Sequence, residues 1–252
     1  MSRLLRILLL LAAALLVGVS GYKLYGIYCE YAAGKTLYGD VAGQVVKSHS
    51  SSSVTEGGTE SEKAPVSIDF DALFQNNEDI VAWIYSEDTK INYPVVQAED
   101  NDYYLRRLLD GSYNIAGTIF MDCGNRPDFS DLNTLIYGHN MKNDTMFGSL
   151  PRYKEQSYYD SHPVLWLLTR DKSYRVELLA GYTTSSDGED YALYTDSAAF
   201  SDYLTRAVQK SDFQTEVELS SVERVAVFST CSYEYDQARY VLIGSLVSIE
   251  NS

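Results

Sequence analysis

The sequence has few cysteines, few histidines and few basic residues. Its 252 residues include three cysteines and three histidines, and 20 lysines and arginines stand against 35 acids, for a formal net charge of -15 at pH 7. Such a charge repels phosphate backbones and argues against a general nucleic-acid binder. The cysteines are too few for a disulfide scaffold and form no metal-ligand spacing, so we expect three free thiols and no metal site. No phosphate loop or dinucleotide fingerprint is present either, so we expect no cofactor.

One long apolar run stands at the N-terminus. It follows Arg3 and Arg6 and carries no charge before Lys23. A helix over residues 7–28 covers roughly 30 Å, enough to cross the hydrocarbon core of a bilayer. The preceding arginines favour a cytoplasmic location for residues 1–6. We therefore predict a single-pass anchor in the cell membrane with the rest of the chain outside; a cleaved signal peptide is the alternative.

A polar stretch separates this anchor from the folded part of the chain. Residues 47–63 consist largely of serine, glycine, threonine and glutamate, a composition typical of a solvated, flexible linker. We predict an extracellular stalk and linker over residues 29–66 and a folded domain over residues 67–252. His49 lies in the linker, where no fixed partner can orient it, so we expect no chemistry from it.

Short apolar segments bounded by turn residues dominate the folded part. Eight short strands with mixed connections predict a mainly β fold, either a barrel or a sandwich. The segments with strand character are residues 80–85, 91–96, 117–121, 134–137, 164–168, 174–182, 224–229 and 240–249. Two segments have helical spacing instead, one after a capping Ser67 or Asp69 and one over residues 197–210, between the sixth and seventh strands.

Three residues in this domain form a set suited to acyl transfer. Cys231 directly follows a predicted strand, and a hairpin joining it to Arg239 would place a guanidinium beside the thiol. A fixed cation lowers the pKa of a thiol and can stabilise an oxyanion. His139 ends another predicted strand and would supply a general acid/base. Taken singly, each has an ordinary structural interpretation as a small buried side chain, a turn residue or a surface charge.

Two segments that contain these residues closely resemble the signature segments of class B sortases. They read TLIYGHNMKNDTMFGSL over residues 134–150 and STCSYEYDQAR over residues 229–239, and the resemblance extends over about residues 70–249. It implies an eight-stranded sortase β-barrel with N-terminal helices and a helix in the crossover between the sixth and seventh strands. It also implies that Cys231 is the nucleophile, His139 the general acid/base and Arg239 the group that stabilises substrate and oxyanion.

The resemblance further implies a membrane-anchored cysteine transpeptidase of a Gram-positive cell surface. Such an enzyme cleaves secreted surface proteins after threonine in a C-terminal sorting signal and passes the acyl group, through a thioester, to an amine of a lipid II-type peptidoglycan precursor. Asn101, Leu105 and Ser229 match family positions that line the substrate groove. A pilin-polymerising sortase, a purely hydrolytic surface cysteine protease and a non-enzymatic peptide-binding module are the alternative functions.

Overall fold

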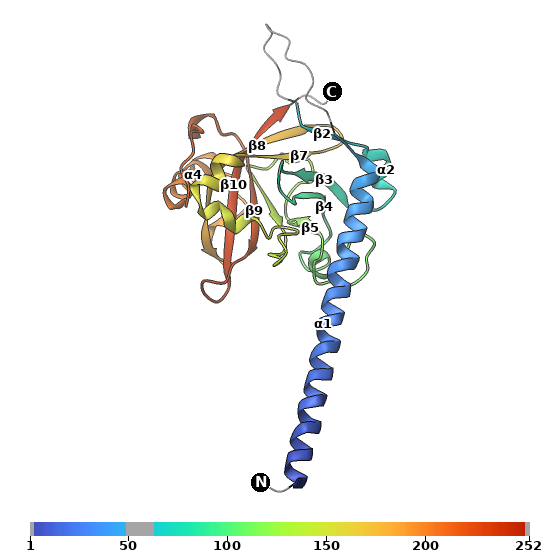
Figure 1. Ribbon diagram of the computed structural model, residues 1–252. Helices are drawn as coiled ribbons and strands as arrows, with labels where there is room; N and C mark the ends of the chain where they lie inside the picture. The colour runs from blue at the N-terminus through green and yellow to red at the C-terminus, as the bar shows by residue number, and fades with distance from the viewer. Residues whose placement is uncertain (1–2, 49–62, 250–252) are drawn as a thin grey trace.

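Eight strands form a closed barrel in the order β10-β8-β7-β3-β4-β5-β6-β9 (Figure 1). The computed structural model describes residues 3–48 and 63–249. Every strand of the barrel coincides with one of the predicted segments, so the barrel is confirmed and the sandwich is excluded. The strands are β3 (Ile80–Tyr85), β4 (Asn92–Val96), β5 (Ile119–Met121), β6 (Asn133–Tyr137), β7 (Val164–Leu168), β8 (Ser173–Ser185), β9 (Val225–Cys231) and β10 (Ala238–Ile249).

Strand β9 shows how the barrel is packed on both of its faces. Successive side chains of a strand point to opposite sides of a sheet. Ala226 and Phe228 accordingly belong to the main core cluster, whereas Val225 and Val227 belong to a second cluster on the outside of the barrel. A strand covered on both faces reads as a continuous apolar run rather than an alternating one.

The outer cluster is covered by α4 (Ser197–Lys210), which lies in the crossover between β8 and β9, as predicted. Asp196 caps this helix by accepting a hydrogen bond from the amide of Ala199, and α2 (Phe70–Phe74) is capped in the same way by Asp69. The remaining turns of helix are η1 (Tyr104–Arg106), η2 (Leu150–Lys154), α3 (Gln156–Ser161), η3 (Glu189–Tyr191) and η4 (Leu219–Ser221).

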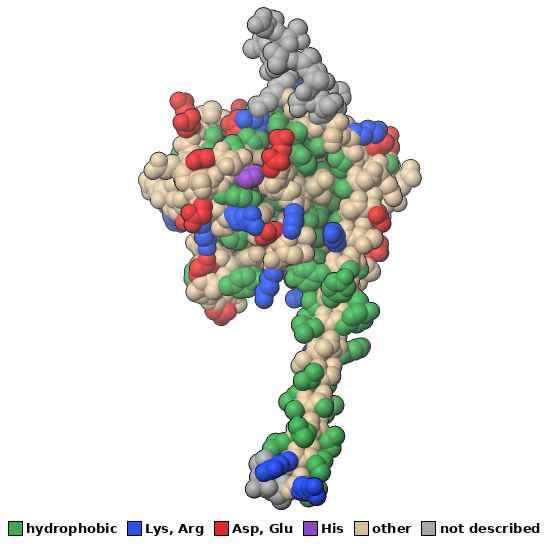
Figure 2. All heavy atoms as spheres, viewed as in Figure 1, with side chains coloured by type: hydrophobic (Ala, Val, Ile, Leu, Met, Phe, Trp, Pro, Cys, Tyr) green, Lys and Arg blue, Asp and Glu red, His purple; other side chains and the backbone are tan. Residues whose placement is uncertain are grey.

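The N-terminal helix α1 (Arg3–Val45) is much longer than the predicted anchor. It runs along one side of the barrel, and its N-terminal half projects far beyond it (Figure 1). The projecting part is mostly hydrophobic, with basic side chains at its tip (Figure 2), and it is long and apolar enough to span a membrane. After α1, β1 (Val46–Ser48) pairs with β2 (Val66–Ile68).

Part of the segment expected to be stalk and linker, residues 29–66, is therefore docked structure. Gly34, Tyr38, Val41 and Val45 are the buried residues of α1, and their spacing places them on one face of the helix. This stripe is narrow, and its neighbours in the sequence are a mixture of polar, small and apolar residues, so the sequence does not mark it. Residues 49–62, which include His49 and most of the polar linker, lie outside the described residues.

The docked part of α1 holds the segment that leads into β5. The Tyr38 hydroxyl lies 2.8 Å from both the carbonyl oxygen of Gly117 and Oγ1 of Thr118. One end of the same segment is fixed by Glu30, whose carbonyl accepts from the side-chain amide of Asn114 (2.8 Å) and whose carboxylate accepts from the amide of Ile115 (3.0 Å). Helix and barrel are thus joined by buried polar contacts as well as by apolar packing.

Replacing Tyr38 with phenylalanine removes the hydroxyl and leaves the buried carbonyl of Gly117 without this donor. We expect the Tyr38→Phe variant to lose about 1–2 kcal/mol of unfolding free energy. Denaturant unfolding of the detergent-solubilised chain measures the loss. Tyr113→Phe, which removes an exposed hydroxyl, is the matched control. Equal stability of the two variants would show that the Tyr38 contacts contribute nothing to docking.

Candidate active site

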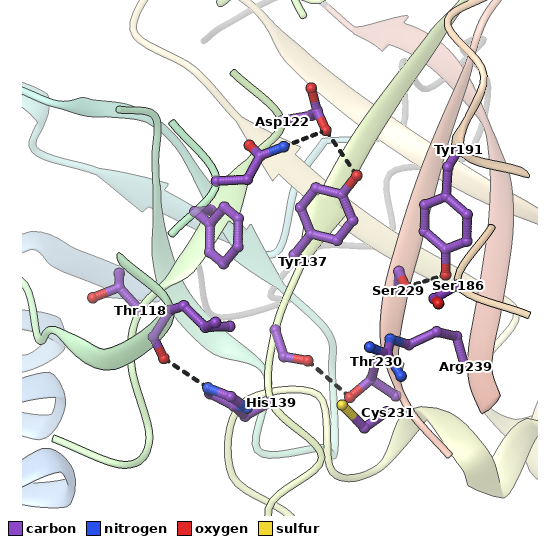
Figure 3. Close-up of a pocket in the computed structure, with 14 residues that line it drawn as sticks. Thr118, Asp122, Tyr137, His139, Ser186, Tyr191, Ser229, Thr230, Cys231 and Arg239 are labelled. Carbon is purple, nitrogen blue, oxygen red and sulfur yellow. Dashed lines mark hydrogen bonds between the residues drawn. The ribbon is translucent and has the colours of Figure 1, made fainter. Parts of the chain in front are cut away.

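A cavity of about 360 Å³ opens at the end of the barrel where β6 and β9 finish and β10 begins (Figure 3). It has both apolar and polar walls, and it lies at the strand ends rather than inside the barrel core. The structure brings all six site residues predicted from the sequence to this cavity: Asn101, Leu105, His139, Ser229, Cys231 and Arg239.

Cys231 and Arg239 are direct cross-strand neighbours. Cys231 is the last residue of β9, and it pairs with Arg239 in the antiparallel β9–β10 ladder. Opposed residues of such a ladder have Cβ atoms about 5 Å apart and side chains on the same face. The Cys231 thiol is free and half-buried. The hairpin predicted to place a guanidinium beside the thiol is therefore present.

The ends of β6 and β9 are joined by several hydrogen bonds. The strands are parallel neighbours, with Tyr137 opposite Ser229. Beyond this pair, the Thr230 hydroxyl donates to the carbonyl of Gly138 (2.8 Å), and the side-chain amide of Asn140 donates to the carbonyl of Cys231 (2.8 Å). These contacts bring the residues on either side of His139 to the end of the strand that carries the thiol.

The His139 imidazole is held by a backbone carbonyl. Its Nε2 lies 2.7 Å from the carbonyl oxygen of Leu105. Figure 3 marks a hydrogen bond of the His139 ring with a dashed line. A carbonyl oxygen only accepts, so Nε2 carries a proton in this contact, and Nδ1 is the acceptor of a neutral ring. Proton transfer with a substrate at Cys231 therefore uses Nδ1 or requires the Leu105 contact to open.

Glycine at position 117 allows the Leu105 carbonyl to reach its place. Gly117 has a φ of 58°, and a Cβ atom there would lie 2.6 Å from the Leu105 oxygen. Only glycine adopts this backbone conformation without strain and leaves room for the carbonyl. The amide of Thr118 donates to the carbonyl of Tyr104 (3.1 Å) and fixes the same turn. The segment held by α1 thus supports the group that orients His139.

Three influences act on the His139 pKa, and their balance lowers it. Burial is the largest, because it disfavours the charged imidazolium. The Leu105 carbonyl opposes burial by accepting a hydrogen bond, whereas the positive charge of Arg106 adds to the lowering. The neutral ring therefore predominates at neutral pH.

Tyr191 is a cavity residue that no sequence motif indicated. It ends η3, its hydroxyl lies 2.8 Å from Oγ of Ser229, and its ring stacks on Tyr137 with centroids 6.3 Å apart. Burial raises the pKa of Tyr191 to about 12, so the hydroxyl stays protonated. With 22 tyrosines in the chain, composition and spacing do not single this one out. Ser229, predicted to contact substrate, thus has a partner within the wall.

Asn101 lines the cavity with both ends of its amide already engaged. Its nitrogen donates to the carboxylate of Asp122 (2.8 Å), and its oxygen accepts from the amide of Cys123 (2.8 Å). The same carboxylate accepts from the hydroxyl of Tyr137 (2.8 Å). Asp122 therefore joins two walls of the cavity, and Asn101 acts as a brace for one of them.

The acid in the β9–β10 hairpin is engaged elsewhere. The Glu234 carboxylate contacts Lys154 and the Ser232 hydroxyl, and these two partners hold its pKa at about 2. The residues that line the cavity do not include Glu234. The carboxylate that does line the cavity, Asp122, accepts hydrogen bonds from Asn101 and Tyr137. The cavity also offers a thiol, an imidazole and a guanidinium, which together suffice for nucleophilic acyl transfer. Among residues 3–48 and 63–249, no group of three or more His, Cys, Asp or Glu side chains could hold a metal ion.

Comparisons with known proteins agree on the kind of protein this chain resembles. No protein-family model matches the sequence. The chain is 38% identical over 177 residues to Sortase B of Listeria monocytogenes, and the aligned region covers 68% of this chain and 71% of the relative. It is 29% identical over 183 residues to Sortase B of Staphylococcus aureus, and the aligned region covers 71% of this chain and 75% of that relative.

Solved structures give the same answer. The crystal structure of sortase B from B. anthracis in complex with AAEK1 superposes with a TM-score of 0.72 at 30% identity, covering 89% of this chain and 100% of that one. The Staphylococcus aureus sortase B–substrate complex superposes with a TM-score of 0.66 at 28% identity, covering 73% and 85%.

The lowered His139 pKa is measurable by NMR. We expect the imidazole of the folded, detergent-solubilised chain to titrate below the ordinary 6.5, and the resonance to vanish in His139→Gln, which assigns it. A titration at or above 6.5 would contradict the dominance of burial.

The lowered pKa of His139 should also make the free energy of unfolding depend on pH. The unfolded chain binds this proton at a higher pH than the folded one does, so unfolding free energy falls as pH decreases from about 6.5 towards the lowered pKa. His139→Gln should remove this part of the pH dependence, as read from denaturant midpoints. An unchanged dependence in that variant would assign it to another group.

Proposed function

This chain belongs to the sortase B family of cysteine transpeptidases, and we propose that it cleaves secreted surface proteins after threonine in a C-terminal sorting signal and joins them to an amine of a peptidoglycan precursor. The observation that carries the proposal is the placement of Cys231 and Arg239 as cross-strand partners at a cavity that His139 also lines. In this proposal Cys231 is the nucleophile, His139 the general acid/base and Arg239 the stabiliser of charge.

The first half of the reaction forms a thioester. The Cys231 thiolate attacks the threonine carbonyl, and the electron pair of the C=O bond moves to oxygen to give a tetrahedral oxyanion. Arg239 suits the stabilisation of this charge because its guanidinium stays positive at every relevant pH and offers several donors in a rigid fork. Collapse of the intermediate breaks the C–N bond, and protonated His139 gives its proton to the departing amine.

The second half transfers the acyl group. Neutral His139 takes a proton from the incoming amine as that amine attacks the thioester carbonyl, and the Cys231 thiolate leaves. The opposed influences on His139 suit these two duties, because burial favours the neutral ring and the Leu105 carbonyl favours the protonated one. Release of the amide product leaves the Cys231 thiolate and a protonated His139, which is the pair that began the first half.

The walls of the cavity suit an extended peptide. Leu105 and Phe120 supply apolar surface, and the Tyr191 hydroxyl and Ser229 supply polar groups. A related structure, from Staphylococcus aureus, is a sortase B–substrate complex, which supports peptide binding at the equivalent place here. We assign Asn101, Leu105 and Ser229 to the substrate-binding walls, with Asn101 acting through its bonds to the backbone and Asp122.

The N-terminal half of α1 is the proposed membrane anchor. Its side chains are exposed and mostly apolar, with Lys23 as the one charged residue of positions 7–28, while Arg3 and Arg6 stand at its tip. By the positive-inside rule, residues 1–6 face the cytoplasm, residues 7–28 span the membrane and the barrel lies outside. In this proposed topology the enzyme works where an exported protein and a lipid-linked amine meet.

Replacing the nucleophile tests the chemistry directly. The Cys231→Ala variant should form no thioester with a sorting-signal peptide and should release no amide product when an amine acceptor is added, as read by mass spectrometry. Cys123→Ala, which removes an exposed thiol, should keep both activities. Amide product from Cys231→Ala would refute the assignment, and hydrolysis alone in the parent protein would favour a protease.

The guanidinium is tested by a second substitution. Arg239→Ala should lower kcat/KM for peptide cleavage by about 10²–10³-fold, the range for losing one oxyanion donor. Arg170→Ala is the control, because Arg170 is exposed in the β7–β8 turn and pairs with Asp71. A loss shared equally by both variants would point to general destabilisation.

A further inference from the structure

Helix α1 leaves the barrel next to the loop that forms one wall of the cavity. Glu30 holds Asn114 and Ile115, and Gly34, one turn later, is the first buried residue of the helix. Figure 1 shows the N-terminal half of α1 and the β9–β10 hairpin at the same end of the barrel. The cavity therefore opens at the end from which the proposed anchor departs.

The length of helix between anchor and barrel is very short. A helix rises 1.5 Å per residue, so Glu30 lies about 3 Å beyond residue 28, or about 10 Å beyond Lys23 if the apolar core of the bilayer ends there. The headgroup layer of one leaflet is about 5–8 Å thick. Residues at the level of Glu30 therefore lie in or directly above this layer. Tyr22, Tyr25 and Tyr28 are exposed on the same stretch, as in an interfacial aromatic belt.

The loop that Glu30 holds carries exposed side chains suited to a lipid headgroup layer. We call residues 102–115 the interfacial loop. Tyr113 is 68% exposed and Tyr103 42% exposed, and the Arg107 guanidinium lies 4.5 Å from the centre of the Tyr103 ring. A β-bridge joins Arg107 to Tyr113, so these side chains form one cluster. Tyrosine rings partition to the membrane interface, and arginine binds lipid phosphates.

The charge of the interfacial loop differs from that of the chain. Arg106 and Arg107 balance Asp102 and Asp110, so the loop is neutral, whereas the whole chain carries -15. The Asp110 carboxylate moreover accepts hydrogen bonds from the hydroxyl and amide of Ser112, which turns it towards its own backbone. The acidic surface that would repel anionic lipids is thus interrupted at this end.

We propose that the interfacial loop rests in the headgroup layer of the outer leaflet, so that the mouth of the cavity adjoins the lipid surface. This inference rests on the proposed anchor and commits to a phospholipid bilayer as the partner of the loop. Leu105 belongs both to this loop and to the cavity wall. A lipid-linked amine reaches the thioester from the plane of the membrane, without leaving it.

The test uses the full chain in vesicles of zwitterionic and anionic phospholipids, a fraction of which carry a nitroxide on the headgroup. Tyr113→Trp reports on the interfacial loop, and Val247→Trp is the matched control. Val247 is exposed towards the other end of β10, about 30 Å along the strand from Ala238. Trp83 and Trp166 are buried, and the parent protein gives their background.

We expect the nitroxide lipid to reduce the added fluorescence of Tyr113→Trp by about twofold or more, because a ring in the interfacial layer lies close to the headgroups. The Val247→Trp signal should stay nearly unchanged. Flotation with the vesicles and thioester formation with a sorting-signal peptide verify that both variants are inserted and folded.

Two results would overturn the inference, and only one of them would also refute the proposed anchor. Flotation without preferential quenching at position 113 refutes the lipid contact and leaves the anchor and the chemistry intact. Failure of the parent chain to float refutes the anchor and the lipid contact together. In either case the cleavage assay on peptide in solution reports separately on the transpeptidase chemistry.

Discussion

The parallel pairing of β6 with β9 is the constraint on which the rest of the site depends. It sets Tyr137 opposite Ser229, and the hydrogen bond from Thr230 to the carbonyl of Gly138 carries the register one step further. Parallel neighbours need long connections, because the chain must return to the same end of the sheet before it can pair again. In this protein the connection includes two barrel strands, β7 and β8, and the helix α4. The pairing that closes the barrel therefore also brings β6, which leads to His139, beside β9, which carries Cys231.

A second set of contacts links α1 to the orientation of the imidazole. Tyr38 contacts Gly117, the Gly117 conformation leaves space for the Leu105 carbonyl, and that carbonyl holds His139. Each contact is a modest one of about 1 kcal/mol. Their importance lies in position, because a general acid/base must sit within hydrogen-bond reach of the atom it serves. The helix thus contributes to the active site although the described lining of the cavity contains no residue of α1.

The sequence predicted the parts of the structure that depend on local patterns. Strands such as Val164–Leu168 have apolar runs with sharp turn signals, and the Cys231–Arg239 hairpin follows from a short connection between two strands. Features that depend on distant partners were missed. The stripe of Gly34, Tyr38, Val41 and Val45 is meaningful only against the barrel surface, and Tyr191 acquires its place only when the crossover folds over Ser229. The hydrogen bonds of Asn101 to Asp122 and to the amide of Cys123 explain why it lines the cavity, a position that the resemblance implied without a physical reason.

Because Cys231 and Arg239 are paired in the β-ladder, the distance between them does not depend on the residues at the tip of the hairpin. Both residues are fixed by backbone bonds within β9 and β10, whereas residues 233–237 at the tip are exposed and make up a turn that ends on the positive φ of Gln237. The tip can therefore lengthen, shorten or change its charge during evolution while sulfur and guanidinium keep their spacing. A family built on such a hairpin can diversify the substrates it accepts one loop at a time, because changes in the loop leave the catalytic groups in place.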